Sequence, residues 1–172
     1  MVMGAYYLAK FGHRFDRRKE KDESGNAQRY FEHVRRVAIL LMDIAGCYDP
    51  YLICVALLHD ALEDTQDLTA QILERFFGPD VARRVRRLSK VPKEGYVERL
   101  KIADLETILV KACDRLDNLL SLGQTTPEFQ EKQLKETRIK YLPLFMTVLG
   151  PKHPVVLRIH AIVHPVYPEQ PV

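Results

Sequence analysis

Two histidines and two aspartates stand where the surrounding pattern calls for apolar side chains. His33 shares a helical face with Tyr30, His59 and Asp60 end the most apolar stretch of the chain, and Asp114 interrupts an apolar helical pattern. Singly, each has an ordinary explanation, because core histidines are usually just hydrogen-bonded and helical aspartates usually face solvent. Together, two imidazoles and two carboxylates suit Mn²⁺, Fe²⁺, Zn²⁺ or Mg²⁺. A cation would also offset the penalty of burying both carboxylates. The set predicts a divalent-metal site.

A second acidic pair, Glu63 and Asp64, follows His59 and Asp60 at a spacing of four residues. If one helix continues through both pairs, these side chains lie one turn apart on the same face. They would then repel one another unless a cation lies among them. The alternative interpretation is a solvated helix end capped by Thr65.

Such a set suits the hydrolysis of a phosphate ester. A divalent metal lowers the pKa of a bound water, and nearby carboxylates accept its proton. Asp114 and Asn118 are four residues apart, so a helix would offer a carboxylate to the metal and an amide to a substrate. The chain has no GxxxxGK[ST] loop, which argues against a P-loop nucleotidase, and no GxSxG elbow, which argues against covalent acyl chemistry.

Composition predicts one ordinary globular domain. The chain has 172 residues, 47% hydrophobic and 28% charged, which excludes disorder as its main state. We expect a single domain over residues 1–172, with a core at about 12–150 and a C-terminal tail at 151–172. No apolar run approaches the roughly 20 residues of a membrane span, so we expect no membrane association. The three cysteines form no CxxC pair, which favours reduced thiols in a cytoplasmic protein. The oligomeric state is left open.

Apolar residues recur at helical spacing, with no strand-like alternation, which predicts an all-α fold. Asp49 and Pro50 read as the cap and first residue of the most buried helix, and Gly78 and Gly150 as stops. The tail is expected to hold one short helix and a proline-spaced extended end. The main helices are predicted at about 27–45, 51–59, 67–77, 80–91, 105–122 and 126–149.

A basic segment spans residues 83–101, which contain eight arginines and lysines and only two acidic residues, Glu94 and Glu98. The commonest explanation for such a run is a solvated helix face. A rim that attracts an anionic nucleotide and a nucleic-acid surface are the alternatives. Nucleic acid ranks last, because no aromatic residue interleaves the run before Tyr96. The net charge of +3 is also too weak to argue for it.

Two motifs carry a family resemblance. ALLHDALEDT at 56–65 and KACDRLDNL at 111–119 resemble the hydrolase domain of RelA/SpoT homologues, within the HD superfamily of metal-dependent phosphohydrolases. In size the chain is most similar to the single-domain small alarmone hydrolases. RYFEHVRRVA at 29–38, FFGPDVARRVRRLSK at 76–90 and ETRIKYLPL at 136–144 extend the resemblance to about residues 12–150. An HD dipeptide alone is a weak signal, whereas HDALEDT with a downstream DRLDN is specific.

The resemblance implies a compact HD-domain helical bundle and a specific reaction. That reaction removes the 3′-pyrophosphate of ppGpp or pppGpp, giving GDP or GTP and pyrophosphate. One metal, most often Mn²⁺, would be held by His33, His59, Asp60 and Asp114. Glu63 and Asp64 would orient or activate the attacking water. The implied substrate contacts are Asn118 to the nucleotide, Arg18 and Lys19 near the pyrophosphate, and Arg138 and Tyr141 where a later helix closes the pocket.

The chain departs from the family pattern at two places. EKDESGNAQ at 20–28 is longer and more charged than the link expected there, so Arg29 is an alternative to Arg18 and Lys19. Asp117 replaces the aromatic residue or histidine common before the asparagine, and it adds negative charge near a polyanionic substrate unless the helix turns it away.

Two other functions stay open. One is the same chemistry on another nucleotide, such as the 2′-phosphate of NADPH. The other is a non-catalytic nucleotide-binding module, against which the intact Glu63–Asp64 pair argues. The chain length leaves no room for a synthetase domain, so we expect hydrolysis alone.

Overall fold

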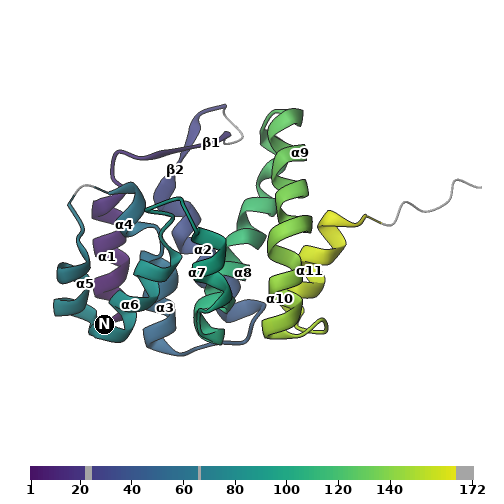
Figure 1. Cartoon of the computed structure of the whole chain (residues 1–172). Helices are drawn as coiled ribbons and strands as arrows, with labels where there is room; N and C mark the ends of the chain where they lie inside the picture. The colour runs from purple at the N-terminus through teal and green to yellow at the C-terminus, as the bar shows by residue number, and fades with distance from the viewer. Residues whose placement is uncertain (22–24, 66, 166–172) are drawn as a thin grey trace, which may run out of the picture.

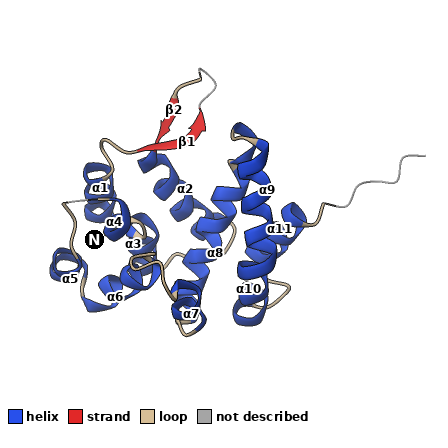
Figure 2. Cartoon of the chain, turned by 45° about the horizontal axis from the view of Figure 1, so that its top comes forward, coloured by secondary structure: helices blue, strands red, loops and turns tan. Residues whose placement is uncertain are grey.

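The computed structural model describes residues 1–21, 25–65 and 67–165, and helices make up most of them (Figure 2), which confirms the all-α prediction. The extended end expected for the tail lies at 166–172, outside the described residues. In chain order the elements are α1 (Val2–Gly12), β1 (Arg17–Lys21), β2 (Ala27–Arg29), α2 (Tyr30–Asp43), α3 (Pro50–Leu58), α4 (Ala61–Asp64), α5 (Ala70–Phe77), α6 (Pro79–Leu88), α7 (Tyr96–Lys101), α8 (Leu105–Leu120), the 3₁₀ turn η1 (Leu122–Gln124), α9 (Pro127–Glu136), the π-helical turn η2 (Thr137–Tyr141), α10 (Leu142–Leu149) and α11 (Pro154–Val163).

Helices α3 and α8 form the centre of the fold. The carboxylate of Asp49 accepts a hydrogen bond from the Leu52 amide at 2.9 Å and Pro50 is the first helical residue, so α3 begins as predicted. Every α3 residue from Leu52 to Leu58 is buried. Helix α8 lies between the group formed by α1 to α6 and the group formed by α9 to α11 (Figure 1). These two helices therefore carry side chains into the middle of the protein.

The hydrophobic core extends on both sides of residues 12–150. Ala5 and Ala9 of α1 and Val155 and Ile159 of α11 are fully buried in the same apolar cluster as the central helices. The single-domain organisation stays a prediction. None of the described helices combines the length and the apolar character that crossing a bilayer requires.

A two-stranded hairpin precedes α2, which the sequence analysis did not predict. β1 and β2 pair antiparallel, with Arg17 opposite Arg29 and Lys21 opposite Ala27. The expectation of helix from residue 27 was therefore wrong for three residues, and α2 begins at Tyr30. The strands are charged and lack apolar alternation, so periodicity carried no signal for them.

The chain does not continue as one helix through the two acidic pairs, which corrects that assumption. α3 ends at Leu58, Asp60 has φ −98° and ψ 0°, and the one-turn helix α4 begins at Ala61. Glu63 and Asp64 therefore lie on a separate element, and their placement relative to Asp60 is set by this break.

The helix predicted at 126–149 begins at Pro127 with Thr126 as its cap, and it ends at Gly150, which has a φ of +89°. Between these ends, η2 widens the helix at Thr137–Tyr141. Pro143 follows two residues later and cannot donate a helical hydrogen bond to the carbonyl of residue 139. The wider turn thus falls where a regular ladder could not continue, and it places Tyr141 near the centre of the fold.

Asp104 is expected to stabilise the start of α8. Its carboxylate accepts hydrogen bonds from the Thr107 amide at 2.8 Å and from Arg83 at 2.8 Å. Replacing Asp104 by alanine should lower the free energy of unfolding by about 1–2 kcal/mol, measured by urea denaturation at pH 7. Asparagine keeps the cap and loses the charge, so Asp104→Asn should be destabilised less.

The stabilisation by Asp104 should depend on pH. Burial raises the pKa of Asp104, but its bonds from Thr107 and Arg83 outweigh burial and lower the pKa below its ordinary value of 3.8. A lowered pKa in the folded state means that the stabilisation is complete above pH 3.8 and is lost as pH falls through the lowered value. The difference between wild type and Asp104→Ala should therefore shrink in acid, and a constant difference down to the lowest pH would contradict the role of the charge.

Candidate metal centre and adjoining cleft

Three donor side chains, those of His33, His59 and Asp60, have ligand atoms within 4.8 Å of one another in the interior, and Asp114 faces both histidines. His33 comes from α2, His59 and Asp60 from the break after α3, and Asp114 from α8. His33 Nε2 lies 3.6 Å from Asp60 Oδ2 and 3.2 Å from Asp114 Oδ1. His59 Nε2 lies 3.1 Å from Asp60 Oδ2 and 3.6 Å from Asp114 Oδ1. All four side chains are buried. The structure thus brings together the four residues that the sequence analysis singled out.

This arrangement fits a divalent cation. Donor atoms bound about 2.1 Å from one ion lie about 3.0–3.5 Å apart. The observed separations between imidazole nitrogens and carboxylate oxygens are 3.1–3.6 Å. The Nδ1 of His59 donates to the carbonyl of Ala56 at 2.8 Å, so in the neutral ring the lone pair lies on Nε2. That nitrogen is buried and has no hydrogen-bond partner among the described residues. An unpartnered buried nitrogen facing two carboxylates is what a metal ligand requires.

The electrostatics of the cluster also demand positive charge. Burial raises the pKa values of Asp60 and Asp114, but neighbouring histidines, and Lys111 beside Asp114, outweigh burial and hold both pKa values well below 3.8. Burial lowers the pKa of His33, but its bonds to Asp114 and other carboxylates raise it to about 9. The pKa of His59 is likewise lowered by burial and raised to about 10, chiefly by Asp60. The two carboxylates therefore stay ionised and attract a cation or protons.

Two further side chains bond the carboxylates of the cluster, and the sequence analysis missed both. The Tyr30 hydroxyl donates to Asp60 Oδ2 at 2.7 Å, and the Lys111 ammonium donates to Asp114 Oδ2 at 2.6 Å. Lys111 is 2% exposed. Signals for both exist in the sequence: Tyr30 lies one turn before His33 on the same face, and a lysine within the apolar face of α8 must find a partner.

The second acidic pair divides between two environments. Glu63 accepts hydrogen bonds from the Lys90 amide at 2.9 Å and the Lys90 ammonium at 3.4 Å. The pKa of Asp64 is raised, first by burial and then by the negative charge of Asp60. Burial raises the pKa of the Tyr30 hydroxyl most, and the negative charges of Asp60 and then Asp64 raise it further. Asp64 is thus electrostatically coupled to the cluster, while Glu63 is hydrogen-bonded to Lys90 in the loop after α6.

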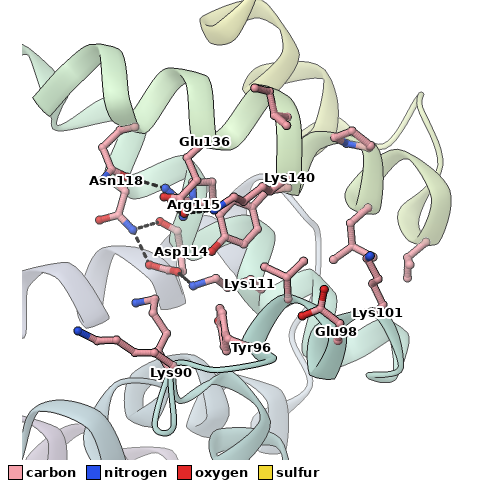
Figure 3. Close-up of a pocket in the computed structure, with 18 of the residues that line it drawn as sticks. Lys90, Tyr96, Glu98, Lys101, Lys111, Asp114, Arg115, Asn118, Glu136 and Lys140 are labelled. Atoms are coloured by element: carbon pink, nitrogen blue, oxygen red, sulfur yellow. Dashed lines mark hydrogen bonds and ion pairs between the residues drawn. The ribbon is translucent and has the colours of Figure 1, made fainter. Parts of the chain in front are cut away.

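A cleft of about 1110 Å³ adjoins the cluster (Figure 3). Asp114 and Asn118 line one end of it, and the Asn118 amide donates to Asp114 Oδ1 at 2.7 Å. Basic side chains in its lining outnumber the acidic Glu98, Asp114 and Glu136. The volume suits a nucleotide, and the charge favours an anion. The basic lining residues are Arg18, Lys90, Lys93, Lys101, Lys111, Arg115 and Lys140.

The residues implied as substrate contacts are only partly gathered here. Arg18 lines the cleft and donates to Asn118 Oδ1 at 2.6 Å, and Tyr141 lines it from η2. Among the described residues that form the cleft, Lys19, Arg29 and Arg138 are not found. The Lys19 ammonium lies 4.7 Å from the ring centroid of Phe129 at the cleft edge, and Arg29 is exposed on β2.

Arg138 has a different environment from the one expected. Its guanidinium donates to the carbonyl of Val163 at 2.7 Å and so holds the end of α11. Arg115 takes the position beside Tyr141 instead, with its guanidinium carbon 4.1 Å from the ring centroid. Arg115 is buried on α8 and lines the cleft. It directly follows Asp114 in the DRLDN motif, which is the sequence signal that could have identified it.

Comparisons with known proteins agree with this geometry. A family model described as HD domain matches residues 5–147. The guanosine-3′,5′-bis(diphosphate) 3′-pyrophosphohydrolase MESH1 of Drosophila melanogaster is 35% identical over 132 residues, which are 73% of this chain and 71% of that protein. GTP pyrophosphokinase rsh of Brucella melitensis is 32% identical over 153 residues, 81% of this chain and 19% of that protein. The chain thus spans about a fifth of the length of the Brucella protein.

A solved structure is similar over almost its whole length. It is that of a metazoan orthologue of SpoT that hydrolyses ppGpp, with a TM-score of 0.79 and 28% identity, covering 94% of this chain and 92% of that one. A structure of lmo0812 from Listeria monocytogenes, with a TM-score of 0.60 and 24% identity, shares the fold. These matches confirm the resemblance drawn from the HDALEDT and DRLDN motifs.

Proposed function

The chain belongs to the HD domain family, and from that membership we propose that it is a divalent-metal-dependent hydrolase that removes the 3′-pyrophosphate from guanosine 3′,5′-bis(diphosphate). The products are GDP, or GTP from the pentaphosphate, and pyrophosphate. MESH1, whose name states this activity, aligns with 73% of the chain at 35% identity.

The observation that carries the proposal is the position of the donor cluster at the end of a basic cleft. Asp114 belongs to both, because it faces His33 and His59 and also lines the cleft. An anionic nucleotide in the cleft would therefore have one of its phosphates beside the cluster. A basic cleft without the donor cluster would support nucleotide binding but not hydrolysis.

The cluster supplies the ligands in this proposal. His33, His59, Asp60 and Asp114 would hold one metal ion, which when bound would lower the pKa of a water and polarise a phosphoryl oxygen. Two imidazole nitrogens with two carboxylate oxygens are a donor set that Mn²⁺ accepts, and we propose Mn²⁺ as the ion. Tyr30 and Lys111 orient Asp60 and Asp114 through the bonds described above.

The remaining side chains handle the proton and the phosphates. Asp64, with its raised pKa, is suited to accept the proton of the attacking water. Arg18 and Asn118 lie together at the cluster end of the cleft and would orient the scissile group. Lys111 and Lys90 would neutralise non-bridging oxygens, because both line the cleft on the side of Asp114. We infer a cytoplasmic location, since all three cysteines are unpaired thiols.

Incubation with ppGpp and Mn²⁺ tests the function. The purified protein should release pyrophosphate and form GDP, detected by ion-exchange chromatography. EDTA should abolish the reaction, and excess Mn²⁺ should restore it, because the cluster holds its ion reversibly. The double variant Glu63→Gln with Asp64→Asn should be inactive and still folded.

Four results would decide against the proposal. Absence of pyrophosphate release, or release by the double variant, would overturn it. Turnover of other nucleotides in a panel that includes NADPH, with none of ppGpp, would keep the chemistry and change the substrate. Tight ppGpp binding without turnover would favour a binding module.

A further inference from the structure

Asp117, the residue that adds a negative charge to the DRLDN motif, does not face the cleft. It lies one turn after Asp114 on α8, is 2% exposed, and is absent from the described residues that line the cleft. Its Oδ2 lies 2.7 Å from Nδ1 of His33. The helix thus turns this charge away from the substrate and toward the back of a candidate metal ligand.

His33 is held between two carboxylates of α8. Its Nε2 faces Asp114 Oδ1 at 3.2 Å, and its Nδ1 faces Asp117 Oδ2 at 2.7 Å. An ionised carboxylate only accepts hydrogen bonds, so Nδ1 carries a proton that it donates to Asp117. Metal binding requires the neutral ring, and in that form the lone pair lies on Nε2, which faces Asp60 and Asp114. The contact to Asp117 therefore selects the tautomer that can bind a metal.

Arg36 also holds the carboxylate of Asp117 in place. Its Nε donates to Oδ1 at 2.7 Å and its Nη2 to Oδ2 at 3.1 Å, a bidentate pair that sets the plane of the carboxylate. Arg36 lies one turn after His33 on α2, so both residues of this helix contact Asp117 of α8. Its Nη1 donates to Gln28 of β2 at 3.2 Å.

We propose that Asp117 is a positioning residue of the metal centre: held by Arg36, it locks the His33 ring with Nε2 toward the ion and strengthens that nitrogen as a ligand. The inference rests on the proposed metal-dependent function and adds a residue to it. Removing a carboxylate that accepts a hydrogen bond from the second nitrogen of a ligating histidine typically weakens metal binding about 10- to 100-fold. Arg36 and Asp117 both line a second, smaller cavity of about 530 Å³.

Metal binding measured without nucleotide tests the inference. Asp117→Asn should bind Mn²⁺ about 10- to 100-fold more weakly than wild type in calorimetric titration. Arg36→Gln, at a partly exposed position, should show a smaller loss in the same direction. Glu106→Gln is the matched control, because Glu106 is a half-exposed carboxylate on the same helix, in a loose 3.8 Å pair with Arg84. It should bind Mn²⁺ like wild type.

The spectrum of bound Co²⁺ separates positioning from general stability. Asp117→Asn and Arg36→Gln should shift the visible absorption of the Co²⁺ protein, whereas Glu106→Gln should leave it unchanged. Folding of each variant is compared by circular dichroism in EDTA. If Asp117→Asn does not fold, the Mn²⁺ affinity and Co²⁺ spectrum of Arg36→Gln test the inference instead. Wild-type affinity and an unchanged spectrum in the folded variants would overturn the inference. Normal Mn²⁺ binding by wild type without ppGpp hydrolysis would overturn only the proposed function.

Discussion

Replacing Asp64 by asparagine is expected to lower kcat for ppGpp hydrolysis by about 10²- to 10⁴-fold while Mn²⁺ binding persists. Burial and the negative charge of Asp60 raise the pKa of Asp64. A carboxylate with a raised pKa is a stronger base than an ordinary aspartate, so it accepts the proton of the attacking water more readily. Asparagine keeps the shape and cannot accept that proton. Pyrophosphate release at saturating metal and substrate measures the loss.

Glu63→Gln is the matched comparison for Asp64→Asn. Both oxygens of Glu63 are already engaged by the amide and the ammonium of Lys90. Glu63→Gln should therefore act mainly through Lys90, which lines the cleft, and raise KM more than it lowers kcat. A larger fall of kcat in Glu63→Gln than in Asp64→Asn would show that the base is assigned to the wrong residue.

The pH profile gives a second readout of Asp64. The rate should rise with pH as Asp64 ionises and then level off, because only the carboxylate accepts a proton. Since the pKa of Asp64 is raised, this rise should lie above pH 3.8, the ordinary value for aspartate. The rise should be missing from the residual activity of Asp64→Asn, and its survival there would assign it to another group.

The grouping of the donor side chains could be predicted from the set of four residue types, although each residue taken singly also had an ordinary explanation. His33 lies on the buried face of α2, and Asp114 on the buried face of α8. The direction of Glu63 and Asp64 could not be predicted in the same way. It depends on the backbone of Asp60, which breaks the helix after α3, and no proline or glycine marks that break.

The contacts of long polar side chains were the least predictable part of the site. Arg138 and Arg115 are both helical arginines near Tyr141, yet Arg138 bonds the carbonyl of Val163 while Arg115 lies over the ring. The choice depends on where α11 ends in space, which no local pattern encodes. Asp117 shows the same limit, because its charge is visible in the sequence and its partner, Arg36, is 81 residues away.

Replacing Asp114 by asparagine is expected to weaken Mn²⁺ binding more than the roughly 100-fold typical of outer-shell changes, and to destabilise the protein as well. Asp114 Oδ1 faces both histidines, and Oδ2 accepts from the buried Lys111 ammonium at 2.6 Å. Burial lowers the pKa of Lys111, but attraction to Asp114 raises it, so the ammonium stays charged. Leaving a buried charge without its partner should reduce the free energy of unfolding by about 3–5 kcal/mol, measured by urea denaturation in EDTA.

The double variant Asp114→Asn with Lys111→Met separates the two effects. Methionine fills the space of the lysine stem without a charge, so most of the lost stability should return. Mn²⁺ affinity should stay low, because the carboxylate is still missing. If the double variant bound Mn²⁺ like wild type, Asp114 would not be a ligand, and the cluster would lose the residue that joins it to the cleft. If the single variant were as stable as wild type in EDTA, the Lys111–Asp114 pair would contribute nothing to the stability of the fold.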